Sequence, residues 1–452
     1  MTVLGRVLLF LRHWFRPNSL GDVYTPTTTA KLAYVSRKTL ESNFIKYLHL
    51  AGKQIILYGH SGSGKTTLVD TILKQRGMAY ITTHCESSTT FNDLLINAFD
   101  ELELFYRSEI SNGKKFESEA EISAELNAIG AAIKQTVSEE HQETYVRVLP
   151  PQLTPQRLSE TLGKLKLIWV IEDFHKVDDA EKKRIADVIK IFIDKANKYP
   201  QLKIICIGAV DTARDMIKLD PNLSTRVSEL SVPLLTEEEI LEIINQGCKC
   251  LNIEMTQPLK DKIMHYSNRL ASLAHQMCYD ICYSNEIMRT CKWSVCIGDD
   301  RFRDAIESYL DSNSDTFKSI YEASVKDPIG WYILKTFTVH GQNKLSIKNI
   351  KKRICNKKHS FADNDINLKL LELSSGQNNI LRYDANSGKY SISSPFWGAF
   401  LKMQIAIEEA NQAKAEKDKR NVNLLLENQD DADALLLQIL LKRYEMRTLI
   451  RN

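Results

Sequence analysis

The sequence predicts an α/β fold in which a parallel sheet is wound by helices and followed by smaller, mainly helical units. Between residues 30 and 235, short apolar segments alternate with amphipathic segments of helical periodicity, which is typical of a parallel sheet with crossover helices. A glycine-rich motif follows the first of these apolar segments, and two adjacent acids end a later one. From residue 236 onward helical periodicity dominates.

Composition is that of a globular protein with more than one domain. The chain has 452 residues, of which 43% are hydrophobic and 26% are charged. Its net charge is only +3, so any affinity for nucleic acid would have to come from a local basic patch.

The cysteines predict a reducing, cytoplasmic location. There are nine of them, an odd number, and no secretory signal precedes the chain's first globular segment. Six lie between residues 248 and 296, but their spacings are not paired C-x-x-C motifs. We therefore expect buried core cysteines here rather than a zinc site.

The N-terminal segment 3–16 predicts an amphipathic helix and not a membrane span. Its apolar run is shorter than the roughly 20 residues needed to cross a bilayer, and Arg6 and Arg12 interrupt it. Docking on this protein or on a partner is the favoured interpretation, with a membrane-surface helix as the alternative. One helical face would carry Val3, Val7, Phe10, Leu11 and Trp14.

The pattern along the chain predicts five parts. Residues 1–29 form the N-terminal helix and a Pro/Thr-rich linker. Residues 30–235 form the sheet domain, with a helical insertion without strands at about 107–158. The expected strands are 54–58, 78–83, 165–173 and 202–207, and the expected helices are 37–50, 67–73, 91–106 and 180–197.

Residues 59–66, GHSGSGKT, match the phosphate-binding pattern G-x-x-x-x-G-K-[ST]. Glycines let backbone N–H groups turn toward phosphates, Lys65 would reach the β- and γ-phosphates, and the Thr66 hydroxyl would bind Mg²⁺. An apolar strand precedes the motif and a helix follows it, so phosphates would lie at a helix N-terminus. The predicted nucleotide contacts are Gly59, His60, Ser61, Gly62, Ser63, Gly64, Lys65, Thr66 and Thr67.

Glu172 and Asp173 end the apolar strand 165–173. A P-loop ATPase needs one carboxylate to hold Mg²⁺ and another to orient the attacking water, usually in the order Asp, then Glu. Here the order is reversed, which leaves two alternatives. Either Glu172 joins Thr66 at the metal with Asp173 as the base, or hydrolysis is weak because the shorter Asp173 reaches the water poorly.

The C-terminal half predicts three further units. Thr236 and three following acids open a helix, and helical patterns continue to residue 312 as a small all-α lid. Residues 318–408 show three helical patterns (329–339, 346–357 and 364–374) and then two strands (379–383 and 389–393), the layout of a winged helix. Residues 411–452 read as a charged, then Leu-rich, helical tail.

A basic run between residues 341 and 360 suits phosphate contacts. The next helical segment, where base reading usually occurs, carries Asp363, Asp365 and Glu372 against Lys369. Two interpretations therefore stay open for the winged-helix unit, namely non-specific DNA contact and a protein–protein spacer. The candidate DNA contacts are Lys348, Lys351, Lys352, Arg353, Lys357 and Lys358.

Together, the P-loop, the acidic strand, the third strand and the helical lid resemble an AAA+ ATPase. More narrowly, the chain resembles the branch that holds origin-recognition, transposition-regulator and STAND ATPases. Residues 34–37 (YVSR) stand where this branch places its adenine-side segment, and residues 266–275 resemble the lid segment that carries sensor 2. The resemblance covers about residues 30–312, and a C-terminal winged helix is also found in bacterial mobile-element and phage-defence ATPases of this kind.

This resemblance implies several roles. Tyr34 and Val35 would line the adenine, and Arg226 would be an arginine finger that reaches a neighbouring subunit's γ-phosphate, which implies a homo-oligomer. Ser272 stands where the family often has a sensor-2 Arg, with Arg269 as a weak substitute. No clear sensor-1 Asn follows strand 202–207, and Asp211 and Thr212 are the candidates there. These departures favour a slow switch over a fast motor.

We therefore expect an oligomeric switch that binds ATP and Mg²⁺, hydrolyses ATP and controls a protein effector. The resemblance suggests bacterial antiphage defence as its setting. Two alternatives stay open, a DNA-binding ATPase of the transposition-regulator or origin-recognition type and a scaffold that binds nucleotide without hydrolysing it.

Overall fold

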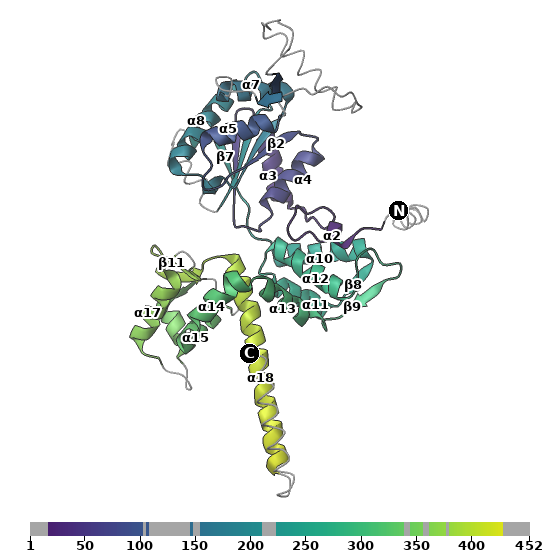
Figure 1. Cartoon of the computed structure of the whole chain (residues 1–452), viewed down its shortest axis with the longest axis vertical. Coiled ribbons are helices and arrows are strands. Elements are labelled where there is room, and N and C mark those ends of the chain that lie inside the picture. The colour runs from purple at the N-terminus through teal and green to yellow at the C-terminus, as the bar shows by residue number, and fades with distance from the viewer. Residues whose placement is uncertain are drawn as a thin grey trace. The chain divides into compact units, whose positions relative to one another are not determined.

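The computed structural model describes residues 17–102, 105–107, 145–147, 154–209, 223–338, 344–355, 361–376 and 379–427. The chain divides into two compact units (Figure 1). The sheet unit is Ser36–Leu234, and the helical unit combines Met1–Val35 with Leu235–Asn452. Residues 30–35, which we expected in the sheet domain, thus group with the C-terminal half, as do the residues of the expected linker.

A five-stranded parallel sheet forms the centre of the sheet unit; the sequence predicts a parallel sheet with four of these strands, and β7 is the addition. Its strand order is β2-β5-β6-β1-β7, and every neighbouring pair is parallel. The carboxyl ends of all five strands therefore meet at one edge, where ligands bind in open α/β folds. The strands are β1 (Gln54–Tyr58), β2 (Tyr80–His84), β5 (Ile168–Glu172), β6 (Lys203–Gly208) and β7 (Val227–Ser231).

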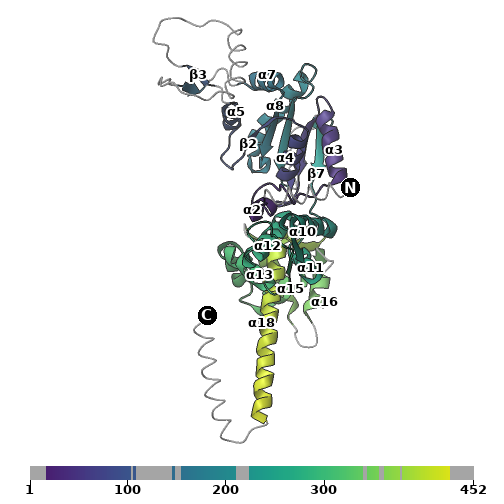
Figure 2. The same cartoon turned by 90° about the vertical axis from the view of Figure 1, so that its right-hand side faces the viewer.

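Helices cover both faces of this sheet (Figure 2). All five residues of β5 and all six of β6 are buried, which explains why these strands read as continuous apolar runs. On one face Trp169 and Ile204 pack with α5 (Phe91–Asp100), α7 (Pro155–Leu165) and α8 (Asp179–Lys195). On the other face Ile55 and Ile205 pack with α3 (Lys38–His49) and α4 (Lys65–Gln75).

The region before α7 differs from the sequence expectation. We predicted helices without strands over 107–158, but β3 (Phe105–Arg107) and β4 (Tyr145–Arg147) form an antiparallel pair, and α7 begins inside this range at Pro155. The rest of the predicted insertion lies outside the described residues. Strand β5 also begins later than predicted, because Lys166 ends α7 in a left-handed conformation with φ of 57°.

The first part of the helical unit carries the predicted helical lid. Its helices are α10 (Glu237–Leu251), α11 (Gln257–Tyr266), α12 (Ala271–Ser284) and α13 (Phe302–Ser312). A capping box between Thr236 and Glu239 begins α10, as the acidic first turn suggests. The expectation of an all-α unit is wrong, because β8 (Ile253–Met255) and β9 (Val295–Ile297) form a parallel pair. The left-handed Asn252 ends α10 and lets the chain continue as β8.

The chain before residue 36 is anchored on this lid. It includes the short helix α2 (Leu20–Val23). The fully buried Tyr24 donates its hydroxyl hydrogen to the Ile244 carbonyl at 3.2 Å. A Cβ on Gly247 would lie 2.3 Å from the Tyr24 ring, so α10 needs glycine at this point. The next residue, Thr25, donates its backbone N–H to His275 Nδ1 at 3.1 Å.

The second part of the helical unit follows the layout that we predicted, with one added strand. Antiparallel strands in the order β10-β12-β11 accompany the helices. The added strand is β10, which is three residues long. The elements are α14 (Ser319–Ser324), α15 (Pro328–Thr336), β10 (Lys344–Ser346), α16 (Ile347–Ile354), α17 (Asp363–Ser374), β11 (Leu381–Asp384) and β12 (Lys389–Ile392).

A long helix, α18 (Pro395–Glu427), follows and runs without interruption through residues 408–411. Glu408 Oε2 accepts hydrogen bonds from the Tyr321 hydroxyl at 2.9 Å and from Trp331 Nε1 at 2.7 Å. Glu409 forms an ion pair with Lys335. These contacts hold the N-terminal half of α18 against α14 and α15. Within the described part of the chain, no helix is long and apolar enough to cross a membrane.

Candidate nucleotide-binding site

The P-loop connects the carboxyl end of β1 to the first turn of α4, at the edge where all five strands end. Gly62 and Gly64 have φ of 74° and 86°, a left-handed conformation that favours glycine. A Cβ on Gly59 would lie 2.3 Å from the Val232 carbonyl oxygen. All three glycines are therefore required by the backbone path and not only by a ligand.

Lys65, the first residue of α4, folds back over this loop. Its Nζ donates to the Gly59 carbonyl at 2.9 Å and to the His60 carbonyl at 2.8 Å. Burial lowers the pKa of Lys65, and the negative charges of Glu172 and Asp173 oppose that shift. The amine is thus held over the turn whose N–H groups would surround a phosphate.

Thr66 and Glu172 are in contact. The Thr66 hydroxyl donates to Glu172 Oε2 at 3.2 Å and so joins α4 to the end of β5. Glu172 is 8% exposed, and burial raises the pKa of its carboxyl group, while the hydrogen bond from Thr66 and the charge of His84 oppose that shift. A hydroxyl and a carboxylate oxygen are ligands that Mg²⁺ prefers. The two residues predicted to hold the metal therefore lie together.

Asp173 has a different environment from Glu172. Its backbone is left-handed with φ of 56°, and it precedes the single turn Phe174–Lys176. Its carboxylate forms an ion pair with Lys176 at 2.7 Å, with both side chains about half exposed. An exposed pair of this kind contributes less than about 1 kcal/mol. Asp173 is therefore tied to its own turn, but weakly.

One side chain of this site, His84, was not predicted. His84 ends β2 directly opposite Glu172 in the strand register, and its charge lowers the pKa of Glu172. Our predicted strand stopped at Thr83, and a histidine at the carboxyl edge of the sheet was the available signal. The Ser63 hydroxyl is buried and has no hydrogen-bond partner among the described residues. An orphan hydroxyl inside the loop fits a site built for a polar ligand.

Arg226 lies at the opposite edge of the sheet. It is exposed, and its carbonyl accepts from the N–H of Gln54, the first residue of β1. The P-loop begins only after the last residue of β1, about 15 Å further along a five-residue strand. An arginine side chain cannot cover that distance, so Arg226 does not reach the P-loop of its own sheet unit.

A network of lysine–carbonyl hydrogen bonds holds the turn that carries Arg226. Lys203 is fully buried, and its Nζ donates to the carbonyls of Leu50 and Lys53. Lys53 in turn donates its Nζ hydrogen to the carbonyl of Thr225, the neighbour of Arg226. Burial lowers the pKa of Lys203 to about 8. The amino edge of the sheet is thus fixed by lysines that bind carbonyl oxygens rather than carboxylates.

The remaining predicted nucleotide contacts lie in the helical unit. Tyr34 and Val35 are half-buried. In the lid segment, Arg269 has φ of 67° and donates from Nε to the Leu235 carbonyl at 2.7 Å. The two sensor-1 candidates, Asp211 and Thr212, lie outside the described residues.

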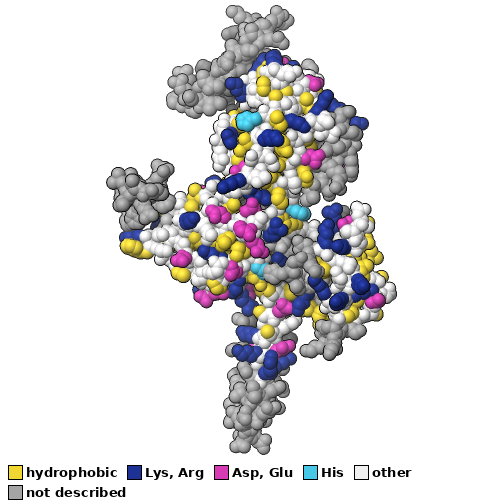
Figure 3. All heavy atoms as spheres, turned by 180° about the vertical axis from the view of Figure 1, so that it is seen from behind, with side chains coloured by type: hydrophobic (Ala, Val, Ile, Leu, Met, Phe, Trp, Pro, Cys, Tyr) yellow, Lys and Arg dark blue, Asp and Glu magenta, His cyan; other side chains and the backbone are white. Residues whose placement is uncertain are grey.

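The basic run is largely engaged by its own unit. Lys351 pairs with Asp363 at 3.0 Å, Arg353 donates to the Thr336 carbonyl at 2.8 Å, and Lys344 lies 3.8 Å from Asp384. Lys348 and Lys352 are exposed, and neither has an ion-pair partner in the part of the chain that the structure describes. Lys357 and Lys358 lie outside that part. On the face in Figure 3, Lys and Arg are scattered among acidic and apolar side chains.

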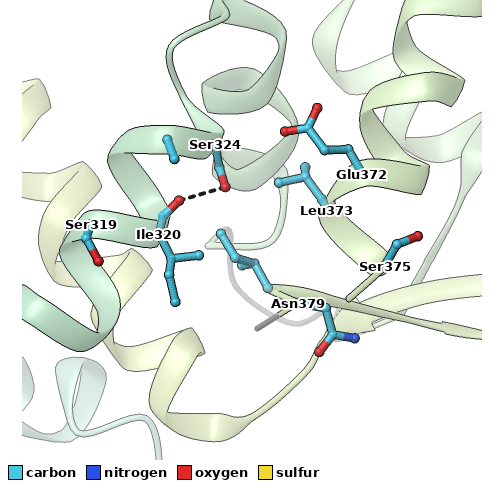
Figure 4. Close-up of a pocket in the computed structure, with 9 residues that line it drawn as sticks. Ser319, Ile320, Ser324, Glu372, Leu373, Ser375 and Asn379 are labelled. Atoms are coloured by element: carbon cyan, nitrogen blue, oxygen red, sulfur yellow. Dashed lines mark hydrogen bonds between the residues drawn. The ribbon is translucent and has the colours of Figure 1, made fainter. Parts of the chain in front are cut away.

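A pocket of about 310 Å³ lies near α17 but lacks the features of a phosphate site (Figure 4). Its charged lining residue, Glu372, pairs with Lys369. The Ser324 hydroxyl is already bonded to the Ile320 carbonyl at 2.8 Å. Among the described residues, no group of three or more His, Cys, Asp or Glu side chains could hold a metal ion.

The strand order and the P-loop position define an α/β P-loop domain with a five-stranded parallel sheet, and mainly helical regions accompany it. No protein-family model matches the chain, and no curated protein matches it.

Solved structures are similar only remotely. The Walker-type ATPase Paby2304 of Pyrococcus abyssi has 15% identity and a TM-score of 0.49, over 83% of this chain and 98% of that chain. The ORC2 protein of Aeropyrum pernix, in ADPNP–ADP complexes, has 13% identity and a TM-score of 0.47, over 86% and 98%. A mutant of Thermotoga maritima RuvB has 12% identity and a TM-score of 0.40, over 79% and 93%.

Proposed function

We propose that this chain is an ATP-binding AAA+ ATPase that acts as a slow oligomeric switch. The observation that carries the proposal is the contact between Thr66 and Glu172 beside the P-loop lysine. This arrangement combines a cation for the phosphates with two oxygen ligands for Mg²⁺ at the first turn of a helix. Bound Mg²⁺ would neutralise phosphate charge and polarise a phosphoryl oxygen.

In this proposal the N–H groups of Gly59–Thr67 hold the phosphates, and Lys65 leaves the two loop carbonyls for the β- and γ-phosphates. Glu172 takes the metal role because it contacts Thr66. Asp173 orients the attacking water once Lys176 releases it. Asp173 must first leave Lys176, and its side chain is short. Both features favour slow turnover. Tyr34 and Val35 keep the adenine-side role that the resemblance implies.

Arg226 supports the oligomeric part of the proposal. Its place at the amino edge suits a contact with the P-loop of a second copy, since its own loop is too far away. Control of a protein effector, with antiphage defence as its setting, is proposed from the resemblance to phage-defence ATPases. A DNA-directed ATPase is the second candidate, and the basic run supports it. The pairing of Lys344, Lys351 and Arg353 weighs against it.

Nucleotide binding and turnover by point variants test this function. Lys65→Ala should abolish ATP binding measured by calorimetry, and Glu172→Gln should remove the Mg²⁺-dependent part of that binding. Asp173→Asn should keep the affinity and lower turnover by about 100-fold. Lys74→Ala is the matched control, because Lys74 lies on the same helix α4 but its exposed side chain pairs with Asp70 instead of the loop carbonyls.

Each outcome distinguishes between two hypotheses about the site. Unchanged affinity in Lys65→Ala would remove the P-loop assignment. Full turnover in Asp173→Asn would assign the base to another residue. ATP binding without measurable turnover in the unsubstituted chain would favour the non-hydrolysing scaffold.

A further inference from the structure

Two consecutive residues between α11 and α12 adopt left-handed backbone conformations. Asn268 has φ of 49° and Arg269 has φ of 67°. Asparagine visits this region more readily than most residues, but for arginine the Cβ makes it unfavourable. Among the described residues, no other two consecutive non-glycine residues both have positive φ. Strain of this kind persists only where surrounding contacts enforce it.

On one side, this turn (residues 267–270) holds the point where the chain re-enters the helical unit. That crossing lies between Leu234 and Leu235. Leu235 donates its N–H to the Arg269 carbonyl at 3.1 Å, and Arg269 Nε donates to the Leu235 carbonyl at 2.7 Å. Both backbone groups of Leu235 are therefore bonded to a single residue of the 267–270 turn.

On the other side, the 267–270 turn is held by the first turns of α18. Asn268 Nδ2 donates to the Pro395 carbonyl at 2.8 Å. Lys402 Nζ donates to Asn268 Oδ1 at 2.9 Å and to the His265 carbonyl at 3.3 Å. A Cβ on Gly398 would lie 2.6 Å from Asn268 Nδ2, so α18 approaches this side chain closely. The Asn268 amide is thus bonded at both ends to α18.

The two sets of contacts meet at neighbouring residues. α18 holds Asn268, and Arg269 holds Leu235. Because the peptide unit between Asn268 and Arg269 is planar and rigid, a change in the dihedrals of Asn268 reorients Arg269. The Arg269 carbonyl, which accepts the Leu235 N–H, would turn with it. The conformation of one strained turn therefore connects α18 with the crossing at Leu235.

We propose that α18 keeps the 267–270 turn in its left-handed form and thereby restrains the chain where it enters the helical unit. When α18 leaves the turn, Asn268 and Arg269 return to favoured dihedrals, and the two bonds to Leu235 break. A partner that draws α18 away would thus loosen the connection between the two units. The proposal is independent of nucleotide binding and goes beyond the proposed function.

The test is hydrogen exchange of the Leu235 N–H in the full-length protein, measured by mass spectrometry with fragmentation to single amides. Lys402→Met keeps the length of the side chain but removes both of its bonds to the turn. It should raise the exchange rate of Leu235 by about tenfold. Lys335→Met is the matched control, because it removes the ion pair with Glu409 of α18 and leaves the turn untouched.

A second amide and a glycine variant make the test specific. The Thr25 N–H, which is bonded to His275 in the same unit, should exchange at an unchanged rate in Lys402→Met. Glycine adopts the left-handed conformation without strain. In an Arg269→Gly background, Lys402→Met should therefore raise the Leu235 rate by less than about threefold.

Four results would overturn the proposal. The first is an unchanged Leu235 exchange rate in Lys402→Met. The second is an equal rise in Lys335→Met, which would assign the effect to α18 docking in general. The third is an equal rise at Thr25, which would mean that the whole unit has loosened. The fourth is the full tenfold rise in the Arg269→Gly background, which would show that backbone strain plays no part.

Discussion

At the scale of single residues, the acid pair at the end of β5 is the most informative feature. The sequence left two alternatives for Glu172 and Asp173, because adjacent carboxylates look alike in a sequence. The structure gives them unlike surroundings. Glu172 is buried against Thr66, and Asp173 is half exposed on Lys176. Side-chain direction at a strand end depends on backbone dihedrals, here the left-handed Asp173, and these cannot be read from residue type.

Gly59→Ala is expected to destabilise the sheet unit by about 1–3 kcal/mol, because its Cβ would meet the Val232 carbonyl oxygen at 2.3 Å. Denaturant unfolding of the nucleotide-free protein measures this change. Gly21→Ala is the control, since a Cβ at that helical position meets nothing within 4 Å. Equal stability of the two variants would contradict the tight packing between the P-loop and the end of β7.

His275 should make the helical unit sensitive to acid. Burial lowers the pKa of His275 to about 4, and its Nδ1 accepts from the Thr25 N–H, which requires the neutral ring. An unfolded histidine titrates near pH 6.5. Between these values the unfolded state binds more protons, so stability falls as the pH drops from about 6.5 to 4, by up to about 3 kcal/mol.

The measurement is the free energy of unfolding of the unsubstituted protein and of His275→Gln across that pH range. Glutamine keeps a hydrogen-bond acceptor but does not titrate, so the difference between the two proteins should shrink with falling pH. A difference that stays constant from pH 7 to 4 would show that folding does not lower the pKa of His275.

At the scale of elements, four of the five central strands were predictable, and β7 and the short strands were not. Strands β1, β5 and β6 are buried on both faces, so their apolar runs stand out from the amphipathic helices between them. The missed strands are β7, which has five residues, and β3, β4, β8, β9 and β10, which have three residues each. Three residues are too few to establish an alternating pattern, and their pairing partners lie far away in the sequence.

Most of the described basic residues around α16 are bonded within their own unit. We therefore expect DNA binding to be weak and its affinity to change little with salt concentration. Only Lys348 and Lys352 are exposed without an ion-pair partner in the described residues. With about two phosphate contacts, log K should fall with log[salt] with a slope near −2. The measurement is titration of a short duplex at several salt concentrations, with Lys348→Ala/Lys352→Ala as the variant. A slope of about −5 or steeper would favour DNA as the direct substrate.

At the scale of the whole molecule, Arg226 and the P-loop occupy opposite edges of one sheet. Arg226→Ala should therefore lower turnover by about 10³-fold while nucleotide affinity stays the same. Mixing Arg226→Ala with Lys65→Ala should restore part of the turnover, because the first supplies an intact P-loop and the second an intact arginine. No recovery in the mixture would exclude a contribution of Arg226 to a neighbouring site.

The two-unit division limits how far sequence motifs predict this site. The P-loop and the acid pair are local to the sheet unit, and their geometry agrees with the motif. Tyr34, Val35 and the lid segment belong to the helical unit, although Tyr34 lies only two positions before the sheet unit begins. A sequence gives the order of such segments, but the packing of Tyr24 and Thr25 on the lid decides which unit they join.

Strand β1 has a mechanical consequence. It is hydrogen-bonded to β6 on one side and to β7 on the other, so it behaves as a stiff rod only five residues long. One end carries Gly59, and the other end is joined to the Arg226 turn through Gln54. A single strand thus joins the P-loop to the Arg226 turn within one copy. If Arg226 meets the P-loop of a second copy, as proposed, β1 would link one nucleotide site to the next along the oligomer.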